Sequence, residues 1–353
     1  MRTARVQRLL RAGKIDALLV SAMKNVRYLT GFTGSSGFAL ITQERQFFYT
    51  DFRYTEQAAK EVQGFDRGTD KGDRVRLLRA ILKTLGIKRL AFEASLPYGF
   101  YERLRSLPAT LVPRENIVEN LRKRKDGTEI ASISKAVERA EKAFLKIKPF
   151  VRVGKREREI ALRLEEQLKK EGCMSIPFDI IVASGSNSSM PHAQVTQRKI
   201  QKGDFVIIDW GGEADGYYSD MTRTLLMGGG DLAAGKRIYC TVNEARRRAI
   251  QCVREGVTTR AVDSAARDTI RDAGYGDYFG HGTGHGVGLD VHEGPRVSRA
   301  KSEKVSRGMV FTVEPGIYLP GTGGVRIEDM VAVEADRTVL LTTLSRELEI
   351  IKT

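Results

Sequence analysis

The chain has 353 residues, which is enough for two or three domains that each bury a hydrophobic core. With 41% hydrophobic residues and 9 prolines, it has the composition of a globular protein and not of a collagen-like or low-complexity chain. The formal net charge of +15 could serve nucleic-acid binding through phosphate contacts. The basic residues are scattered along predicted helices without interleaved aromatic residues, so we favour a solvated basic surface over a nucleic-acid partner.

The sequence does not indicate export or a membrane. No apolar run approaches the roughly 18 residues that a membrane-spanning helix requires. Near the N-terminus, Arg11, Lys14 and Asp16 interrupt the apolar stretch that a signal peptide would need. The 3 cysteines form neither a paired framework nor a CxxC site, which is typical of a reducing compartment. We therefore expect a cytoplasmic protein.

The first third of the chain alternates short apolar runs with helical patterns, which predicts an α/β unit. Strands are expected at 16–22, 37–42, 45–50, 89–92 and 110–112, and helices at 54–62 and 74–85. The composition then turns polar and charged, so we place a domain boundary near residue 122, between a domain 1–122 and a domain 123–353. Just after it, Thr128 can cap a helix with apolar residues on one face.

The remaining two thirds contain two similar halves. Helices at 129–148 and 156–171 precede a strand that ends at Asp209, and helices at 235–254 and 259–273 precede one that ends at Glu314. Each strand follows a basic-Gly pair and ends in an acid six residues after the glycine. The pattern predicts a duplicated helix-plus-hairpin unit around a shared cleft, although few identities are shared and a chance match stays open.

Paired acids are the first sign of chemistry. If the hairpin after Asp209 is symmetric about Ala214 and Asp215, Asp209 and Asp220 lie opposite each other, with β-carbons about 4.5–5.5 Å apart. Two carboxylates at such a short separation require either a shared proton or a cation between them. Glu314 and Glu328 repeat the arrangement across a glycine-rich turn. Taken alone, the two aspartates could equally be ordinary turn residues, and Glu314 could simply end a strand.

Histidines give a second argument, because the chain has only 4. His281, His285 and His292 fall within a dozen positions, among glycines that let the backbone approach a bound group. The four carboxylates carry four negative charges, which two divalent cations would balance. Together with one imidazole they form a mainly oxygen ligand set, which favours manganese or a similar ion over a thiolate-type zinc site. Two ions can share a bridging water and polarise a substrate carbonyl, which is the chemistry of metal-assisted hydrolysis.

These motifs together resemble those of a known family. The runs IIDWGG, YYSDMTRT, GHGTGHGVGLDVHEGP, TVEPGIY and GVRIED resemble the motif set of the pita-bread metallopeptidases, in the branch of Xaa-Pro aminopeptidases and Xaa-Pro dipeptidases (prolidases). Residues 1–122 resemble the creatinase/prolidase N-terminal domain. The resemblance implies an α/β N-terminal domain and an α+β pita-bread catalytic domain with an internal pseudo-two-fold duplication. It also implies a homodimer.

The resemblance assigns metal ligands position by position. It implies that Asp209 binds one ion, that Asp220 and Glu328 bridge both, and that His285 and Glu314 bind the other. Glu314 would also be the general base that takes a proton from the bridging water. Manganese is the expected metal, with cobalt and zinc left open.

Further residues are implied around the substrate. His292 would hydrogen-bond the substrate and stabilise the oxyanion, and His192 would lie over the substrate near the scissile bond. His281 would line the pocket for proline, although a structural role in the glycine loop predicts the same residue. Arg326 could brace the carboxylates or merely form a nearby salt bridge, and Tyr318 is a comparable supporting candidate.

The implied reaction is hydrolysis of the N-terminal Xaa-Pro bond of proline-containing peptides by a metal-bridged hydroxide. We favour an aminopeptidase. A dipeptidase must bind the substrate's terminal carboxylate, for which Arg296 is the candidate, but Arg296 could also be a charge at the rim. A non-catalytic pita-bread binding module is the alternative from another class, and it would use the basic surface.

Overall fold

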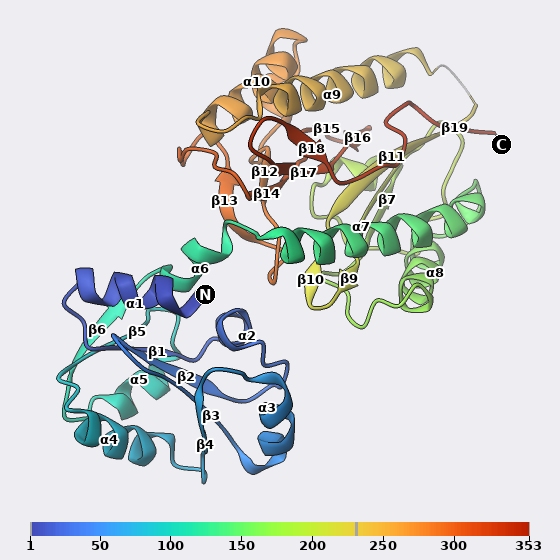
Figure 1. The fold of residues 1–353 in the computed structure, drawn as a ribbon. Coiled ribbons are helices and arrows are strands. Elements are labelled where there is room, and N and C mark those ends of the chain that lie inside the picture. Colours follow the sequence, from blue (N-terminus) through green and yellow to red (C-terminus); the bar gives the residue numbers. More distant parts are fainter. Residues whose placement is uncertain (1, 230–231, 353) are drawn as a thin grey trace. The chain divides into compact units, whose positions relative to one another are not determined.

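The computed structural model describes residues 2–229 and 232–352. The chain divides into two compact units, Met1–Arg122 and Lys123–Thr353, drawn in blue to cyan and in green to red in Figure 1. Among the described residues, no helix combines the length and apolar character needed to cross a membrane.

The first unit is a mixed six-stranded sheet with strand order β4-β3-β2-β1-β5-β6. Its strands are β1 (Ala17–Val20), β2 (Phe38–Thr42), β3 (Gln46–Thr50), β4 (Asp66–Thr69), β5 (Arg89–Glu93) and β6 (Thr110–Arg114). Its helices are α1 (Arg2–Ala12), α2 (Met23–Thr30), α3 (Thr55–Glu61), α4 (Arg74–Leu85), α5 (Tyr98–Leu104) and α6 (Ile117–Arg122), with a 3-10 turn η1 (Phe52–Tyr54). Strand β1 runs antiparallel to β2 and parallel to β5, and the predicted α/β unit is confirmed.

Both faces of this sheet are covered by helices (Figure 1). Leu78 and Leu82 of α4 and Leu104 of α5 pack against Leu19 and Leu40 on one face. Helices α1, α2 and α6 contact one another, and α1 and α2 also contact β2. The sequence pattern did not reveal β4, because this edge strand is mostly exposed and has no apolar alternation.

The second unit has two halves in which a pair of helices precedes an antiparallel hairpin. The first half contains α7 (Gly127–Ile147), η2 (Lys148–Phe150), α8 (Glu157–Lys170) and the sheet β19-β11-β8-β7, and the second contains α9 (Ala233–Cys252), α10 (Thr259–Asp272), η4 (Gly276–Tyr278) and the sheet β13-β12-β14-β17-β18. The strands of the first sheet are β7 (Ile181–Ser184), β8 (Phe205–Trp210), β11 (Met221–Met227) and β19 (Ile350–Ile351). Those of the second are β12 (Gly284–Gly286), β13 (Glu293–Val297), β14 (Val310–Val313), β17 (Asp329–Val333) and β18 (Thr338–Leu340). This repeated order agrees with the predicted duplication.

Two short ribbons extend the central hairpins. The pair β9 (Glu213–Ala214) and β10 (Tyr217–Tyr218) continues the β8–β11 hairpin, and the pair β15 (Gly316–Leu319) and β16 (Gly323–Arg326) continues the β14–β17 hairpin. Strand β7 is followed directly by a 3-10 turn, η3 (Gly185–Ser189).

Helix α7 begins at Gly127, two residues earlier than a cap at Thr128 would allow. Asp126 is the N-cap, and its carboxylate accepts hydrogen bonds from the backbone N–H groups of Thr128 and Glu129. Glu129 reaches back to the N–H of Asp126, which completes a capping box. The prediction that Thr128 caps this helix is therefore wrong, because Asp126 precedes it with a stronger acceptor.

The first hairpin differs in register from the prediction. Asp209 pairs with Thr222, and Ala214 pairs with Tyr217, so the turn is centred on Asp215 and Gly216. Both turn residues have positive φ, 53° and 80°, as a two-residue turn of the primed type requires. Asp209 and Asp220 are consequently diagonal neighbours and not directly opposite, and the expected opposition is wrong by this shift of the turn.

The second hairpin keeps one register throughout. Val313 pairs with Asp329 in β14–β17, and Gly316 pairs with Arg326 in β15–β16. Continuing the register from either ladder places Glu314 opposite Glu328, as the sequence predicted.

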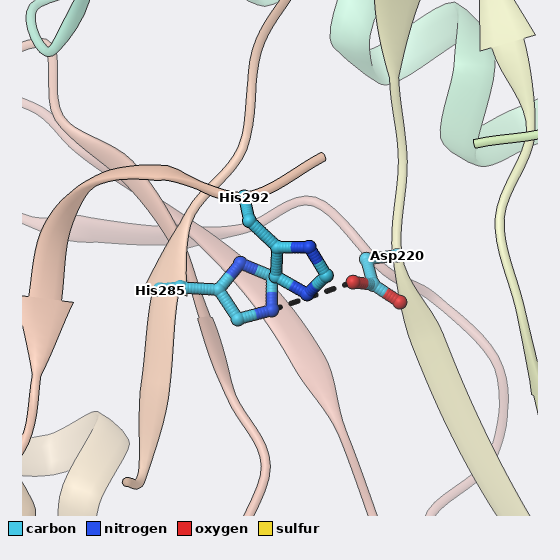
Figure 2. A group of neighbouring side chains, drawn as sticks. All are labelled: Asp220, His285 and His292. Carbon is cyan, nitrogen blue, oxygen red and sulfur yellow. Dashed lines mark ion pairs between the residues drawn. The ribbon is translucent and has the colours of Figure 1, made fainter. Parts of the chain in front are cut away.

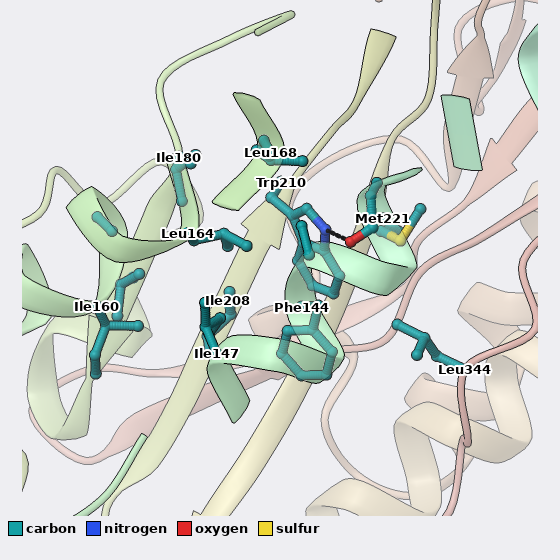
Figure 3. Packing of buried hydrophobic residues seen from close by; sticks show 14 of the residues in the cluster. Phe144, Ile147, Ile160, Leu164, Leu168, Ile180, Ile208, Trp210, Met221 and Leu344 are labelled. Atoms are coloured by element: carbon teal, nitrogen blue, oxygen red, sulfur yellow. Dashed lines mark hydrogen bonds between the residues drawn. The ribbon is translucent and has the colours of Figure 1, made fainter. Parts of the chain in front are cut away.

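The core beneath β8 fixes the strand that carries Asp209. Trp210 is fully buried and stacks on Phe144 of α7, with ring centroids 4.5 Å apart and planes at 18° (Figure 3). Its indole Nε1–H donates to the carbonyl of Ala140 at 3.0 Å. Leu164 and Leu168 of α8 belong to the same core cluster. The residue that follows Asp209 is thus anchored by both packing and a hydrogen bond.

Candidate metal centre

Six side chains with metal-binding atoms gather in the second unit. They form three overlapping groups, within each of which the ligand atoms lie within 4.8 Å of one another: Asp209, Asp220 and Glu328; His285, Glu314 and Glu328; and Asp220, His285 and His292. The structure therefore brings together all five residues predicted as metal ligands, with His292 beside them. Figure 2 shows Asp220 facing the two imidazole rings.

The two central hairpins and β12 supply these groups. Asp209 lies in β8 and Asp220 immediately before β11, whereas Glu314 follows β14 and Glu328 precedes β17. His285 is in β12, between two glycines that allow close strand packing. A β-carbon on Gly284 would lie 1.9 Å from the carbonyl oxygen of Thr312, and one on Gly286 would lie 2.0 Å from that of Gly294. Only glycine permits this approach.

Arg326 joins the acids into one hydrogen-bonded network. Its Nη2 donates to Asp209 Oδ2 at 2.6 Å, and its Nε donates to the hydroxyl of Thr222 at 3.1 Å. That hydroxyl in turn donates to Glu328 Oε2 at 2.8 Å. Arg326 thus forms an ion pair with a candidate ligand, and its role in bracing the carboxylates stays a prediction.

Two carboxylate oxygens in the cluster lack hydrogen-bond partners. Asp209 Oδ1 and Glu328 Oε1 are buried, and no described residue donates a hydrogen bond to either. Buried polar atoms are almost always satisfied, since an unpaired one loses its hydration without compensation. The donor set of four carboxylates and one imidazole is the kind that binds divalent cations, so the residues present fit such ions.

Burial and mutual repulsion shift the titration of the acids. Burial raises the pKa of Asp220 well above its ordinary value, and the charges of Glu328 and Asp209 raise it further. Burial likewise raises the pKa of Glu328, with the charges of Glu314 and Asp209 adding to the effect. The pKa of Glu314 is also raised, mainly by burial. A cation between these groups would favour their ionised forms.

The imidazole of His285 is held with one nitrogen toward the acids. Its Nδ1 lies 3.2 Å from the carbonyl oxygen of Gly286, which places the proton on Nδ1. Nε2 then presents its lone pair 3.5 Å from Asp220 Oδ2 and 3.6 Å from Glu314 Oε1. Burial lowers the pKa of His285, so the neutral, ligating form is favoured.

His281 and Tyr318 form a chain of hydrogen bonds with Arg326. Arg326 Nη1 donates to the Tyr318 hydroxyl at 2.9 Å, and the hydroxyl lies 2.9 Å from His281 Nε2. His281 Nδ1 lies 2.8 Å from the carbonyl oxygen of Gly282, so Nδ1 carries the proton and Nε2 accepts from Tyr318. This chain fixes the ring of His281, whose expected place in a proline pocket stays a prediction.

The other predicted substrate residues lie at the exposed side of the cluster. His292 is exposed, and its ring centroid is 4.3 Å from that of His285. His192 is exposed and follows Pro191, whose carbonyl accepts from Arg326 Nη1 at 3.1 Å. Arg296 is exposed in β13 and pairs in register with His285.

Sequence reasoning missed Thr222 and the carbonyl of Pro191. Thr222 lies two residues after Asp220 in the run DMTRT, and its place opposite Asp209 would have indicated its role if the hairpin register had been right. The Pro191 carbonyl leaves no signal in the sequence, because any residue carries a backbone carbonyl.

Comparison with known proteins gives two family matches. Metallopeptidase family M24 matches residues 131–335, and the Creatinase/Prolidase N-terminal domain matches residues 2–124. An Xaa-Pro dipeptidase of Pyrococcus horikoshii is 38% identical over 95% of this chain and 94% of its own.

Two solved structures share the whole architecture. An Xaa-Pro dipeptidase from Bacillus anthracis superposes with a TM-score of 0.96 at 40% identity, covering 99% of each chain. An X-Pro aminopeptidase from Thermotoga maritima gives 0.90 at 37% identity, covering 96% of this chain and 98% of its own. The chain therefore belongs to metallopeptidase family M24, a family of dinuclear metal enzymes, and joins its catalytic domain to a creatinase/prolidase N-terminal domain.

Proposed function

We propose that the protein is an Xaa-Pro aminopeptidase that uses two divalent metal ions to hydrolyse the N-terminal Xaa-Pro bond of peptides. The observation that carries the proposal is a pair of buried carboxylate oxygens, Asp209 Oδ1 and Glu328 Oε1, that have no hydrogen-bond partner among the described residues and lie inside a group of five candidate ligands. Manganese is the proposed metal because the donors are mostly oxygen, and cobalt or zinc could use the same donors.

In this proposal Asp209 holds one ion, His285 and Glu314 hold the other, and Asp220 and Glu328 are shared. The overlap of the groups supports the sharing, since Asp220 and Glu328 each belong to one group with Asp209, the proposed ligand of one ion, and to another with His285, the proposed ligand of the other. Two divalent ions would also balance the four carboxylates, with Arg326 supplying one further positive charge at Asp209.

Different side chains of the protein would have different roles in the hydrolysis. Bound divalent ions supply Lewis acidity, which polarises a peptide carbonyl and acidifies water. Glu314 is the proposed general base, because a carboxylate beside metal-activated water is placed to accept its proton. Exposed His292, beside His285, would donate a hydrogen bond to the substrate carbonyl oxygen as negative charge develops on it. His192, which follows Pro191, would lie over the substrate near the scissile bond.

The substrate class follows from the relatives and from peptide chemistry. An Xaa-Pro bond is a tertiary amide without an N–H, so a peptidase that needs that hydrogen bond handles it poorly. The relatives carry both dipeptidase and aminopeptidase names. A dipeptidase needs a firm partner for the substrate carboxylate. Arg296 is exposed, so water screens its charge and it would hold a carboxylate only weakly. We therefore favour the aminopeptidase, with the Xaa-Pro dipeptidase as the second candidate.

One pair of substrates separates these candidates. The purified protein loaded with Mn²⁺ should release alanine from Ala-Pro-Ala faster than from Ala-Pro, and EDTA should abolish both reactions. Faster cleavage of Ala-Pro would establish the dipeptidase instead. Absence of hydrolysis with any of Mn²⁺, Co²⁺ or Zn²⁺, together with tight, salt-sensitive nucleic-acid binding, would favour the non-catalytic binding module.

Two expectations about the protein's setting complete the proposal. The cysteines Cys173, Cys240 and Cys252 are all free thiols, which supports a reducing cytoplasmic location. A homodimer is proposed from the family resemblance, and light scattering on the purified protein measures it directly.

A further inference from the structure

Glu157, the first residue of α8, is a buried carboxylate that no step of the proposed hydrolysis uses. Its side chain is inaccessible, with 0% exposure. Oε1 accepts from the N–H and the hydroxyl of Ser184, both at 2.7 Å. Oε2 accepts from the N–H of Thr196 at 3.0 Å and from its hydroxyl at 2.5 Å. Asn187 Nδ2 lies 3.2 Å from both oxygens.

These donors belong to the two ends of one segment, residues 184–196. Ser184 ends β7 and Thr196 closes the loop, so each oxygen of the same carboxylate holds one end. Asn187 also donates to the Thr196 hydroxyl at 3.1 Å, which ties the middle of the segment to its end. The carboxylate of Glu157 thus links the two ends of the loop through hydrogen bonds to both.

The segment that Glu157 closes lies against the candidate metal centre. It carries His192 and the Pro191 carbonyl that accepts from Arg326, which in turn contacts Asp209. The hydroxyl of Ser188 accepts from the N–H of Gly324 at 2.8 Å, and a β-carbon on Gly324 would lie 2.2 Å from the Ser188 carbonyl oxygen. The segment is therefore packed tightly against β16, just before the strand reaches Arg326.

We propose that Glu157 is a positioning residue that fixes the His192 segment in the conformation that binds substrate. The inference rests on the proposed function for its substrate, but the ordering of the segment can be measured without any substrate. If Glu157 no longer closes the loop, only a fraction of molecules present His192 correctly, and the apparent substrate affinity falls by that fraction.

Glu157→Gln is the sharpest test, because it keeps the shape and removes one acceptor. Whichever way the amide turns, its NH2 group faces a backbone N–H, of Ser184 or of Thr196, that cannot reverse. The backbone bonds from Glu157 and Arg158 to the carbonyls of Arg198 and Thr196 persist in this variant, so we expect loosening and not unfolding. Thr196→Val is a milder second variant, and Thr196→Ser is its control because it keeps the hydroxyl.

Two readouts decide the proposal. In metal-free protein, hydrogen exchange of the amides at 184–196 should accelerate about tenfold or more in Glu157→Gln and less in Thr196→Val. With Mn²⁺ and Ala-Pro-Ala, KM should rise about tenfold while kcat stays within about twofold and the metal content is unchanged. Thr196→Ser should behave as the wild type in both assays.

Glu141→Gln is the matched control elsewhere in the same unit. Glu141 is a buried carboxylate on α7 that likewise accepts from backbone N–H groups and a hydroxyl, at Thr343 and Leu344. It should leave exchange at 184–196 and KM unchanged. Equal effects of Glu141→Gln, or wild-type exchange and KM in Glu157→Gln, would overturn the proposal. If the wild type cleaves no Xaa-Pro peptide, the proposed function fails, and the exchange measurement still decides the role of Glu157 in ordering the segment.

Discussion

Replacing Thr222 by valine tests whether the network behind the acids sets metal affinity. Thr222 is fully buried, and valine has nearly its shape, so the change removes a hydroxyl with little change in packing. The hydroxyl donates to Glu328 Oε2 at 2.8 Å and accepts from Arg326 Nε at 3.1 Å. Without it, Glu328 loses the group that orients its carboxylate, and a buried N–H of Arg326 is left unpaired.

The size of the effect follows from the type of hydrogen bond. A bond to an ionised acceptor contributes about 1.5–3 kcal/mol, which corresponds to roughly 10- to 150-fold in an equilibrium constant. Groups that orient metal ligands typically change metal affinity by about 10–100-fold when they are removed. We therefore expect Thr222→Val to bind Mn²⁺ about 10–100-fold more weakly than the wild type.

A competition titration measures this directly. Chelator-stripped protein is titrated with Mn²⁺ in the presence of a fluorescent chelator, and Thr222→Ser, which keeps the hydroxyl, serves as the control. The serine variant should bind like the wild type. Wild-type affinity and turnover in a folded Thr222→Val protein would refute the reasoning, because the hydroxyl would then have no part in holding Glu328.

Four further predictions concern the same unit. Asp220→Ala should lose bound metal and peptidase activity together, as metal analysis and a peptide assay would show; full metal content with normal turnover would exclude Asp220 as a shared ligand. His292→Ala should keep both ions but lower kcat, since its proposed contact strengthens in the transition state, and a change in metal affinity alone would contradict that role. Burial raises the pKa values of Asp220 and Glu328 in the metal-free protein, so the folded state holds protons that the unfolded chain has lost. Their contribution to stability is therefore present at low pH and lost as pH rises above about 4.5: the Tm of metal-free wild type, measured against that of Asp220→Asn, should fall as pH rises above that value, and Mn²⁺ should reverse the fall. The comparison with Asp220→Asn cancels the effect of the buried histidines, whose lowered pKa values change stability in the opposite direction. A Tm difference that rises with pH would contradict the shifts. Trp210→Phe should cost about 1–3 kcal/mol in urea unfolding, because the indole hydrogen bond and part of the Phe144 stack are lost; unchanged stability would show that this core does not anchor β8.

The sequence predicted the elements with strong apolar periodicity and the residues with distinctive chemistry. Helix α4 coincides with the predicted 74–85, and the five candidate ligands meet as expected, because acids at strand ends and clustered histidines are rare enough to interpret. The edge strand β4 escaped notice, since most of its side chains are exposed and its pattern is polar.

What the sequence could not predict was mostly a matter of register and backbone. The position of the turn at Asp215 and Gly216 depends on two positive φ angles, and a shift of the turn by one residue moved Asp220 from opposite Asp209 to its diagonal. The contact from Arg326 to the Pro191 carbonyl and the closure of the loop by Glu157 depend on tertiary packing between segments far apart in the chain. Local patterns carry no information about such contacts.

Because the acids are divided between two hairpins, bound ions would connect the two halves of the second unit. Asp209 and Glu328 lie in different halves of the unit, 119 residues apart along the chain, yet their oxygens belong to one ligand group. An ion held by both would act as a removable cross-link that stabilises the folded state, because only that state gathers the ligands. Loading with metal should then protect the two central hairpins, β8–β11 and β14–β17, against proteolysis, and chelation should make them more susceptible.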